Sequence, residues 1–168
     1  MKTLLLLRHA KSSWSDPTLT DHDRPLNGRG KRDAPRMGKL LKDEQLTPDL
    51  IVSSTAKRAR KTASKVAGGC GYRGEVELTD SFYHGHPRQY IEHLKQVSDE
   101  NDLVMVVGHN PGLESLLDFL TGCGERMPTA ALAHIQFDIS SWKELADSPT
   151  GSLVNLWLPK ELPNETST

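Results

Sequence analysis

The chain has 168 residues, of which 36% are hydrophobic, and a formal net charge of −1. This composition is typical of one globular domain, which we expect over residues 1–160, with a loose C-terminal tail over 161–168. The small net charge argues against nucleic acid as a partner, and no apolar run approaches the roughly 20 residues of a membrane span. Two cysteines in unrelated contexts favour free thiols in a cytoplasmic protein.

Apolar runs alternate with helical patterns along the chain. Strands are expected at residues 3–8, 50–53, 75–79, 102–108, 132–139 and 153–158, the fifth of them half exposed. Helices are expected at 28–44, 56–67, 87–98 and 111–120. Gly68 and Gly69 are expected to end the second helix. The alternation predicts a three-layer α/β/α sandwich with a mostly parallel central sheet.

Two of the predicted strands end in the same way. Four leucines at 4–7 are followed by Arg8 and His9, and the apolar run 104–107 is followed by Gly108 and His109. Open α/β sheets build their sites at the carboxyl ends of their strands. The spacing therefore predicts that the two imidazoles lie together at one edge of the sheet.

The groups expected at this edge of the sheet favour the binding of a dianion. Arg8 presents a planar fork of donors that matches phosphate oxygens, and the start of the second helix adds cations and unpaired N–H groups. Neutral imidazole is also a competent nucleophile. The polar loop 10–27 is long for a compact domain, which indicates a functional segment.

Four motifs then occur in order: LRHAKSSW at 7–14, DHDRPLN at 21–27, SSTAKRARKTA at 53–63 and VGHNPG at 107–112. Together they resemble the histidine phosphatase superfamily, and within it the short SixA-type phosphohistidine phosphatases. The resemblance implies a phosphoglycerate-mutase-like fold and a reaction without metal or cofactor. It assigns His9 as the nucleophile, with Arg8, Arg58 and His109 around the phosphate, and it adds Arg24 as a further phosphate contact.

The proton donor is the point at which the chain departs from the family. The mutase and acid-phosphatase branches carry a Glu after the third strand, where this chain has Asp80, and Asp21 of the first loop is a rival candidate. The first motif also has Ala10 where Gly is commoner. Because imidazole is a better leaving group than an alkoxide, phosphohistidine needs a general acid less than an ester does. We therefore expect phosphohistidine on a protein as the substrate.

Other interpretations stay open from the sequence. The chain is alternatively a phosphatase of small phosphomonoesters, or a non-catalytic module that recognises a phosphorylated partner. A mutase-like isomerase fits less well, because the chain is short and lacks the Glu. Arg60, Lys61 and the cations of 29–42 are interpreted as solvated helix faces. The sequence does not decide whether Trp14 is a pocket wall or a hydrophobic plug, or what His84 and His86 do.

Overall fold

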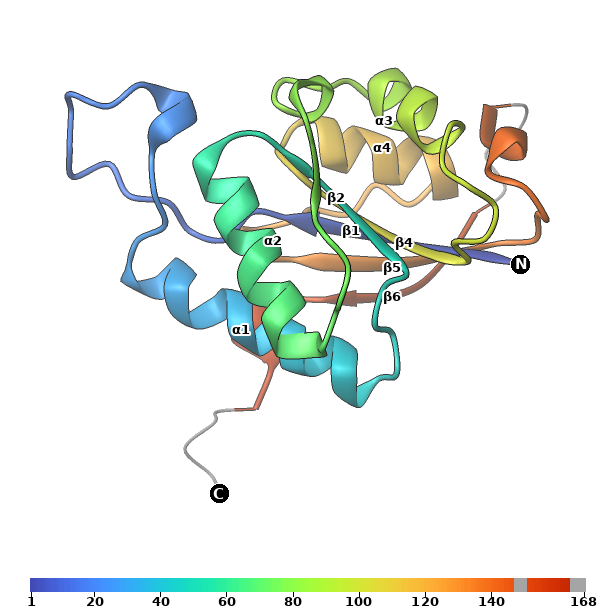
Figure 1. The fold of residues 1–168 in the computed structure, drawn as a ribbon, viewed down its shortest axis with the longest axis horizontal. Helices are drawn as coiled ribbons and strands as arrows, with labels where there is room; N and C mark the ends of the chain where they lie inside the picture. The colour runs from blue at the N-terminus through green and yellow to red at the C-terminus, as the bar shows by residue number, and fades with distance from the viewer. Residues whose placement is uncertain (147–150, 164–168) are drawn as a thin grey trace.

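A computed structural model describes residues 1–146 and 151–163 of the chain. Its centre is a six-stranded sheet in the order β3-β2-β4-β1-β5-β6, with helices on both faces (Figure 1). The strands are β1 (Lys2–Arg8), β2 (Leu50–Ser54), β3 (Glu77–Thr79), β4 (Leu103–Gly108), β5 (Leu132–Phe137) and β6 (Ser152–Trp157). The helices are α1 (Gly28–Asp43), α2 (Lys57–Cys70), α3 (Pro87–Leu94) and α4 (Gly112–Thr121).

The sheet is mixed but mostly parallel, as the sequence predicted. Strands β3, β2, β4 and β1 run in one direction, whereas β5 pairs antiparallel with both β1 and β6. The parallel strands therefore bring their carboxyl ends to one edge. In the register of β1 with β4, Arg8 lies opposite Gly108, so the residue that follows each strand is a histidine.

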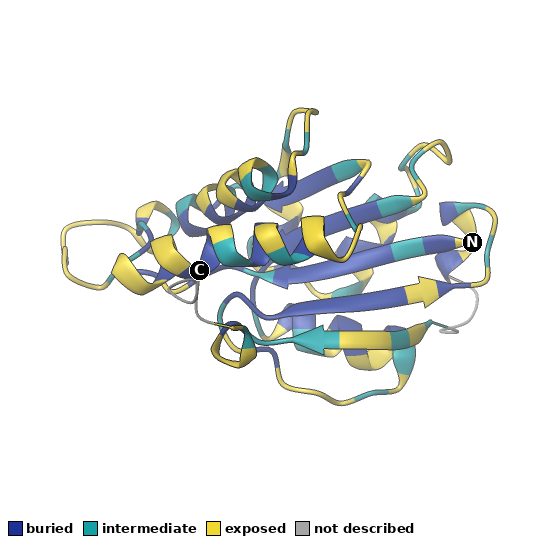
Figure 2. Cartoon of the chain, turned by 90° about the horizontal axis from the view of Figure 1, so that it is seen from below, coloured by how far each residue is buried: buried dark blue, intermediate teal, exposed yellow. Residues whose placement is uncertain are grey.

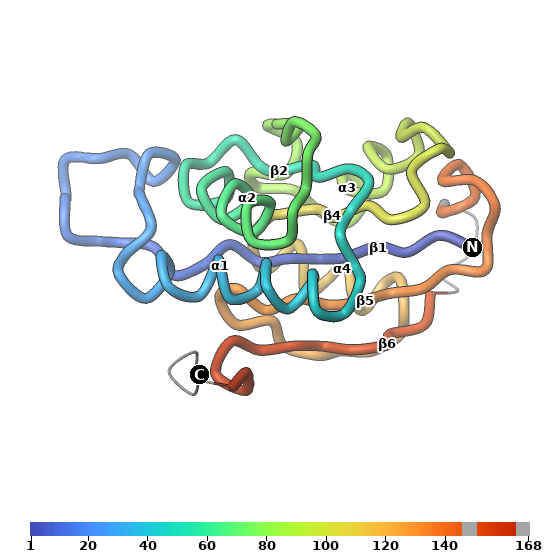
Figure 3. Tube along the Cα trace, turned by 60° about the horizontal axis from the view of Figure 1, so that its bottom comes forward, coloured from blue at the N-terminus to red at the C-terminus, as the bar shows by residue number. Residues whose placement is uncertain are grey.

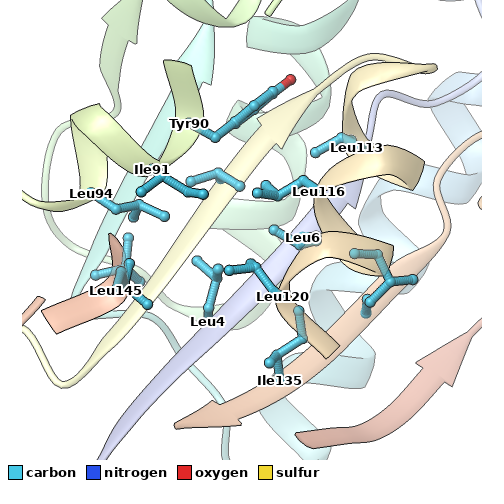
Figure 4. Close-up of a cluster of buried hydrophobic side chains, with 14 of the residues drawn as sticks. Leu4, Leu6, Tyr90, Ile91, Leu94, Leu113, Leu116, Leu120, Ile135 and Leu145 are labelled. Atoms are coloured by element: carbon cyan, nitrogen blue, oxygen red, sulfur yellow. The ribbon is translucent and has the colours of Figure 1, made fainter. Parts of the chain in front are cut away.

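The four leucines of β1 fill both layers of the core. Leu4 and Leu6 belong to the cluster under α3 and α4, while Leu5 and Leu7 belong to the cluster under α1 and α2. The alternation follows from the two-residue period of a strand. Figure 4 shows Leu6 beside Leu116 and Leu4 beside Leu120, both of α4. All four leucines are fully buried, and each contributes about 1.5–3 kcal/mol of hydrophobic free energy. The central strands are dark in Figure 2, and the helices expose their outer faces.

Helix α2 is longer than predicted, because Gly68 and Gly69 do not end it. It continues to Cys70 and is terminated by Gly71, which has a φ of 80° in the left-handed region. A Cβ on Gly69 would lie 3.1 Å from the Cα of Gly38 in α1. The glycine therefore serves the close crossing of α1 and α2, and not a helix end.

Two further expectations differ from the structure. Helix α3 ends at Leu94, although the apolar pattern extended to 98. In strand β5 only Gln136 is exposed, although the alternating pattern predicted a half-exposed strand. On the face that was expected to be exposed, His134 is buried, with its ring stacked 6.0 Å from that of Trp157 in β6.

The loop at residues 10–27 projects beyond the carboxyl edge of the sheet (Figure 3). An antiparallel bridge between Ser12 and Leu26 closes its base, and a short 3-10 turn spans Asp21–Asp23. At the other end of the chain, the carbonyls of Pro159 and Leu162 accept hydrogen bonds from Arg36 of α1, at 3.0 and 3.3 Å. The expected tail at 161–168 is thus held at its start, and residues 164–168 lie outside the described residues.

Candidate active site

The two histidines meet at the carboxyl edge of the sheet. The ring centroids of His9 and His109 are 5.1 Å apart, and the two residues are only 6% and 7% exposed. The parallel register of β1 and β4 produces this juxtaposition. Arg8 lies opposite Gly108, and the next residue in each strand direction is His9 or His109. The backbone N–H of His9 also donates to the carbonyl of Gly108 at 3.1 Å, which joins the two strand ends.

The backbone around His9 is held on both sides. The N–H of Ala10 donates to the hydroxyl of Thr62 in α2 at 2.9 Å, and the carbonyl of His9 accepts from the N–H of Ala130 at 3.0 Å. The Nδ1 atom of His9 lies 2.8 Å from the carbonyl oxygen of Ala10. A carbonyl only accepts, so Nδ1 carries the proton and Nε2 keeps a lone pair.

Electrostatics keep His9 neutral. Burial lowers its pKa to about 3, and the positive charges of Arg58, Arg8 and Arg24 add to the effect. Protonation would place a further cation among these arginines without water to solvate it. At neutral pH the ring therefore has an unprotonated Nε2, which is the form that a nucleophile requires.

Three arginines surround the imidazoles, and Arg24 and Arg58 are buried. Arg8, at the end of β1, donates from Nη1 to the carbonyl of Met127 at 3.2 Å. Arg58, in the first turn of α2, donates to the backbone carbonyl of Asp21 at 2.7 Å and to its carboxylate at 3.1 Å. The Nε atoms of Arg8 and Arg58 are buried with no hydrogen-bond partner among the described residues. Each of these two arginines therefore keeps a buried N–H donor that is not used within the described residues.

Arg24 is held from the loop. Its Nη1 donates to the hydroxyl of Ser12 at 2.8 Å, and its Nε donates to the carboxylate of Asp21 at 3.1 Å. The Trp14 ring lies over its guanidinium, 3.5 Å from ring centroid to Cζ. Trp14 is itself 72% exposed, so it forms a rim of the site and is not a hydrophobic plug.

Asp21 is placed as an ionised partner of the arginines. Burial opposes its ionisation, but a 2.6 Å hydrogen bond from the Tyr83 hydroxyl and the charge of Arg58 together hold its pKa well below the usual value. A carboxylate that is ionised at neutral pH has no proton to give. The structure therefore favours a positioning role for Asp21 over the role of general acid.

Asp80, the other candidate acid, lies in the short turn that follows β3. Its carboxylate accepts a hydrogen bond from the hydroxyl of Thr55, which in turn is 2.9 Å from Nε2 of His22. Within residues 1–146 and 151–163, its hydrogen bonds include neither imidazole. Asp80 thus ties the end of β3 to the end of β2 and to the projecting loop.

His109 is the second neutral imidazole. Its pKa is lowered to about 3, mainly by burial, and the positive charge of Arg58 acts in the same direction. Its Nε2 shares a 2.8 Å hydrogen bond with the hydroxyl of Ser54, at the end of β2. Its Nδ1 is buried without a partner among the described residues. The sequence reasoning missed the support from Ser54, although the polar run that ends β2 was a usable signal.

Other groups gather beside His109. A pocket of about 220 Å³ is lined by Tyr83, His84, His86 and His109 among others, which places the unassigned His84 and His86 next to the site. Arg60 donates to the carbonyl of Thr55 at 3.0 Å and stays outside. Within the described part of the chain, no three His, Cys, Asp or Glu residues form a group that could hold a metal ion.

Comparison with known proteins agrees with this geometry. A family model described as "Histidine phosphatase superfamily (branch 1)" matches residues 4–83. A protein of Arabidopsis thaliana, named as uncharacterised and chloroplastic, is 35% identical over 152 residues, which is 85% of this chain and 70% of that protein. The chain belongs to the histidine phosphatase superfamily. Membership in this superfamily, together with SixA-type structural neighbours, supports phosphatase activity on a phosphorylated substrate.

Solved structures identify the branch. A candidate phosphohistidine phosphatase SixA from Nakamurella multipartitia has a TM-score of 0.82 and 28% identity, and the match covers 94% of this chain and 96% of that one. Another, from Agrobacterium tumefaciens, has a TM-score of 0.77 and 29% identity, over 94% and 98%. The histidine phosphatase here is therefore of SixA type, with the phosphoglycerate-mutase-like fold. In residues 1–146 and 151–163 we find no helix with the length and apolar character to cross a membrane.

Proposed function

We propose that the protein hydrolyses its substrate through a phosphohistidine formed on His9. The Nε2 lone pair attacks phosphorus, the bond from phosphorus to the leaving group breaks, and the leaving group takes a proton from solvent water. Water then attacks the phosphorylated His9 and releases inorganic phosphate. The observation that carries this proposal is the hydrogen bond from Nδ1 of His9 to the Ala10 carbonyl, which leaves Nε2 unprotonated inside a cluster of arginines.

The surrounding charges suit the transferred group. Arg8, Arg58 and Arg24 would hold the phosphoryl oxygens, and an N–H of His109 would add a further hydrogen bond. Fixed cations in a water-poor site stabilise the charge of a phosphoryl transition state. Since guanidinium groups supply this positive charge, we propose that the reaction needs no metal ion.

We further propose that the substrate is phosphohistidine on a protein. The leaving group is then an imidazole, which departs with little help from a general acid. Two features of the site support this choice. Asp21 is held ionised, and the hydrogen bonds of Asp80 run to Thr55 instead of to the imidazoles. In addition, the exposed ring of Trp14 offers a partner an aromatic surface directly over Arg24.

The cellular location of the protein is also a proposal. Cys70 and Cys123 are both free, which supports a reducing, cytoplasmic location.

The first experiment traps the intermediate. The protein is incubated with a labelled phosphodonor and quenched, and the bound label is tested for stability to acid and base. We expect acid-labile, base-stable phosphate that is absent from His9→Ala, and turnover that survives a chelator. His86→Asn serves as a matched histidine control. Labelling of His9→Ala at the level of the unsubstituted protein would assign the nucleophile elsewhere, and complete loss of turnover in chelator would overturn the metal-free reaction.

The second experiment compares substrates by kcat/KM. A phosphohistidine protein should be turned over more efficiently than phosphoserine, a sugar phosphate or an aryl phosphate. Asp80→Asn should change kcat/KM for the esters and for phosphohistidine by the same factor, because its hydrogen bonds run to Thr55. Trp14→Ala should raise KM for the protein substrate only. Higher efficiency on a small phosphomonoester would replace the proposal with the small-molecule alternative. Tight binding of phosphopeptide without any turnover would favour a recognition module.

A further inference from the structure

A second basic cavity lies away from the two imidazoles. It has a volume of about 420 Å³, within the range of small-molecule sites, and α1 supplies most of its charge. Its charged lining consists of Arg29, Arg32, Arg36, Lys160 and the single carboxylate of Asp33. Figure 3 shows the C-terminal segment, which carries Lys160, beside α1. The sequence alone presented these arginines as a solvated helix face, whereas the fold collects them around a hollow.

Part of this lining is fixed in place. Asp33 is buried, and its carboxylate lies 3.5 Å from Nε of Arg29 and 3.2 Å from Nη1 of Arg36. Arg36 also donates to the carbonyls of Pro159 and Leu162, so α1 and the C-terminal segment form one wall. The buried carboxylate and these carbonyls therefore orient the guanidinium groups before any ligand arrives.

The charge of the cavity is unbalanced. Four cations face one carboxylate, which leaves an excess of three positive charges. Among the described residues, no carboxylate lies within ion-pair distance of Arg32 or Lys160. Guanidinium groups bind phosphate oxygens in pairs, and several cations around a small volume favour an anion with several charges.

The cavity is separate from the catalytic residues. Its opposite wall is made by Pro128 and Thr129, and none of the three active-site arginines lines it. The residues on either side of that wall contact the active site instead. The Met127 carbonyl accepts a hydrogen bond from Arg8, and the Ala130 N–H donates one to the carbonyl of His9. The two sites are thus back to back across one short segment.

From this arrangement we propose that the cavity binds a soluble small molecule that carries a diphosphate group. Diphosphate is small enough for the volume, and its charge at neutral pH balances the excess of the lining. Arg32 and Lys160 would supply the new contacts, while Arg29 and Arg36 would hold the anion against the wall. This binding is independent of the phosphatase reaction, so it is measured without turnover.

The test uses inorganic pyrophosphate as the probe and calorimetry as the measurement. Arg58→Ala serves as the background, because it weakens the catalytic phosphate pocket. In that background we expect one bound pyrophosphate, weakened by about tenfold when either Arg32→Gln or Lys160→Gln is added, since each removes a charged hydrogen-bond donor. Arg73→Gln, an exposed arginine beyond α2, is the matched control and should change nothing. Affinity should fall as salt is raised.

Several results would overturn the proposal. Equal affinity in the Arg32→Gln/Lys160→Gln double variant would place the pyrophosphate elsewhere, and loss of all binding in Arg58→Ala alone would place it in the catalytic pocket. Equal binding of citrate would show a general anion surface without preference for diphosphate. Turnover of an aryl phosphate by Arg32→Gln, measured without pyrophosphate, should match that of the unsubstituted protein and shows that the variant is folded.

Discussion

Acid should destabilise the fold through the two buried imidazoles. His9 and His109 both have a pKa lowered to about 3, first by burial, whereas an unfolded histidine has a pKa of 6.5. Between these two values the unfolded chain binds more protons than the folded chain, so stability falls as the pH falls. The stability that the two neutral histidines contribute is fully present above pH 6.5 and is lost progressively as the pH falls toward 3.

The magnitude follows from the same shift. At pH 5 an unfolded histidine is almost fully protonated and the folded one is not, which costs about 2 kcal/mol per group relative to pH 8. Two groups set an upper bound of about 4 kcal/mol. Carboxylates with a lowered pKa, such as Asp21, reduce the stability only at lower pH, because the pKa of an unfolded aspartate is 3.8. The window from pH 8 to 5 therefore isolates the histidines.

Urea unfolding at pH 8, 7, 6 and 5 measures this slope. We expect His9 and His109 together to contribute a loss of about 2–4 kcal/mol over the window, and His109→Gln to remove about half of that contribution. His86→Asn, which removes an exposed histidine, is the matched control; His134, lowered by burial as well, adds the same slope to each variant. Saturating phosphate should flatten the slope, because a bound dianion raises both pKa values. A flat profile without phosphate would refute the reasoning, since His9 would then titrate as an ordinary exposed imidazole.

Three other substitutions probe the supports of the site. Gly38→Ala places a Cβ 2.6 Å from the carbonyl oxygen of Val66 and should cost about 1–3 kcal/mol in urea unfolding without changing the substrate preference. Ser54→Ala leaves His109 without its hydroxyl partner and should lower kcat/KM for an aryl phosphate by about tenfold, with the fold intact by circular dichroism. Asp21→Asn should raise KM for every substrate while leaving the ratio of ester to phosphohistidine kcat unchanged; a selective loss of ester kcat would restore Asp21 as the acid.

The sequence was most informative where a physical pattern was unambiguous. Four consecutive leucines need burial on both sides, and the parallel sheet with helices on both faces provides it. Likewise, equal spacing from strand to histidine predicted the meeting of His9 and His109, because neighbouring parallel strands end at one edge. Family motifs then separated Arg58 from Arg60, and the structure places Arg58 in the cluster and Arg60 outside it.

Features that depend on distant partners were not readable from the sequence. Gly69 looks like a helix end until the crossing with Gly38 of α1 is known. The alternation of β5 indicates that His134 is exposed unless the Trp157 ring of β6 is known to stack on it. The ionised state of Asp21 depends on Tyr83, which is 62 residues away in sequence. In each case the structure depends on a tertiary contact with a distant residue, which the sequence of the local segment does not reveal.

The positions of Asp21 and Asp80 also bear on whether the site suits the P–O bond of an ester or the P–N bond of phosphohistidine. Both candidate acids are committed to hydrogen bonds that serve the architecture, Asp21 with the arginines and Asp80 with Thr55. An ester in such a site would have to expel an alkoxide without a donor, which costs the 10²–10⁴-fold contribution typical of general acid catalysis. A phosphorylated imidazole avoids this loss, because its leaving group resembles the nucleophile that replaces it. In the proposed mechanism, the same arginines serve the forward attack and the hydrolysis of phosphorylated His9, since the phosphoryl charge is alike in both steps.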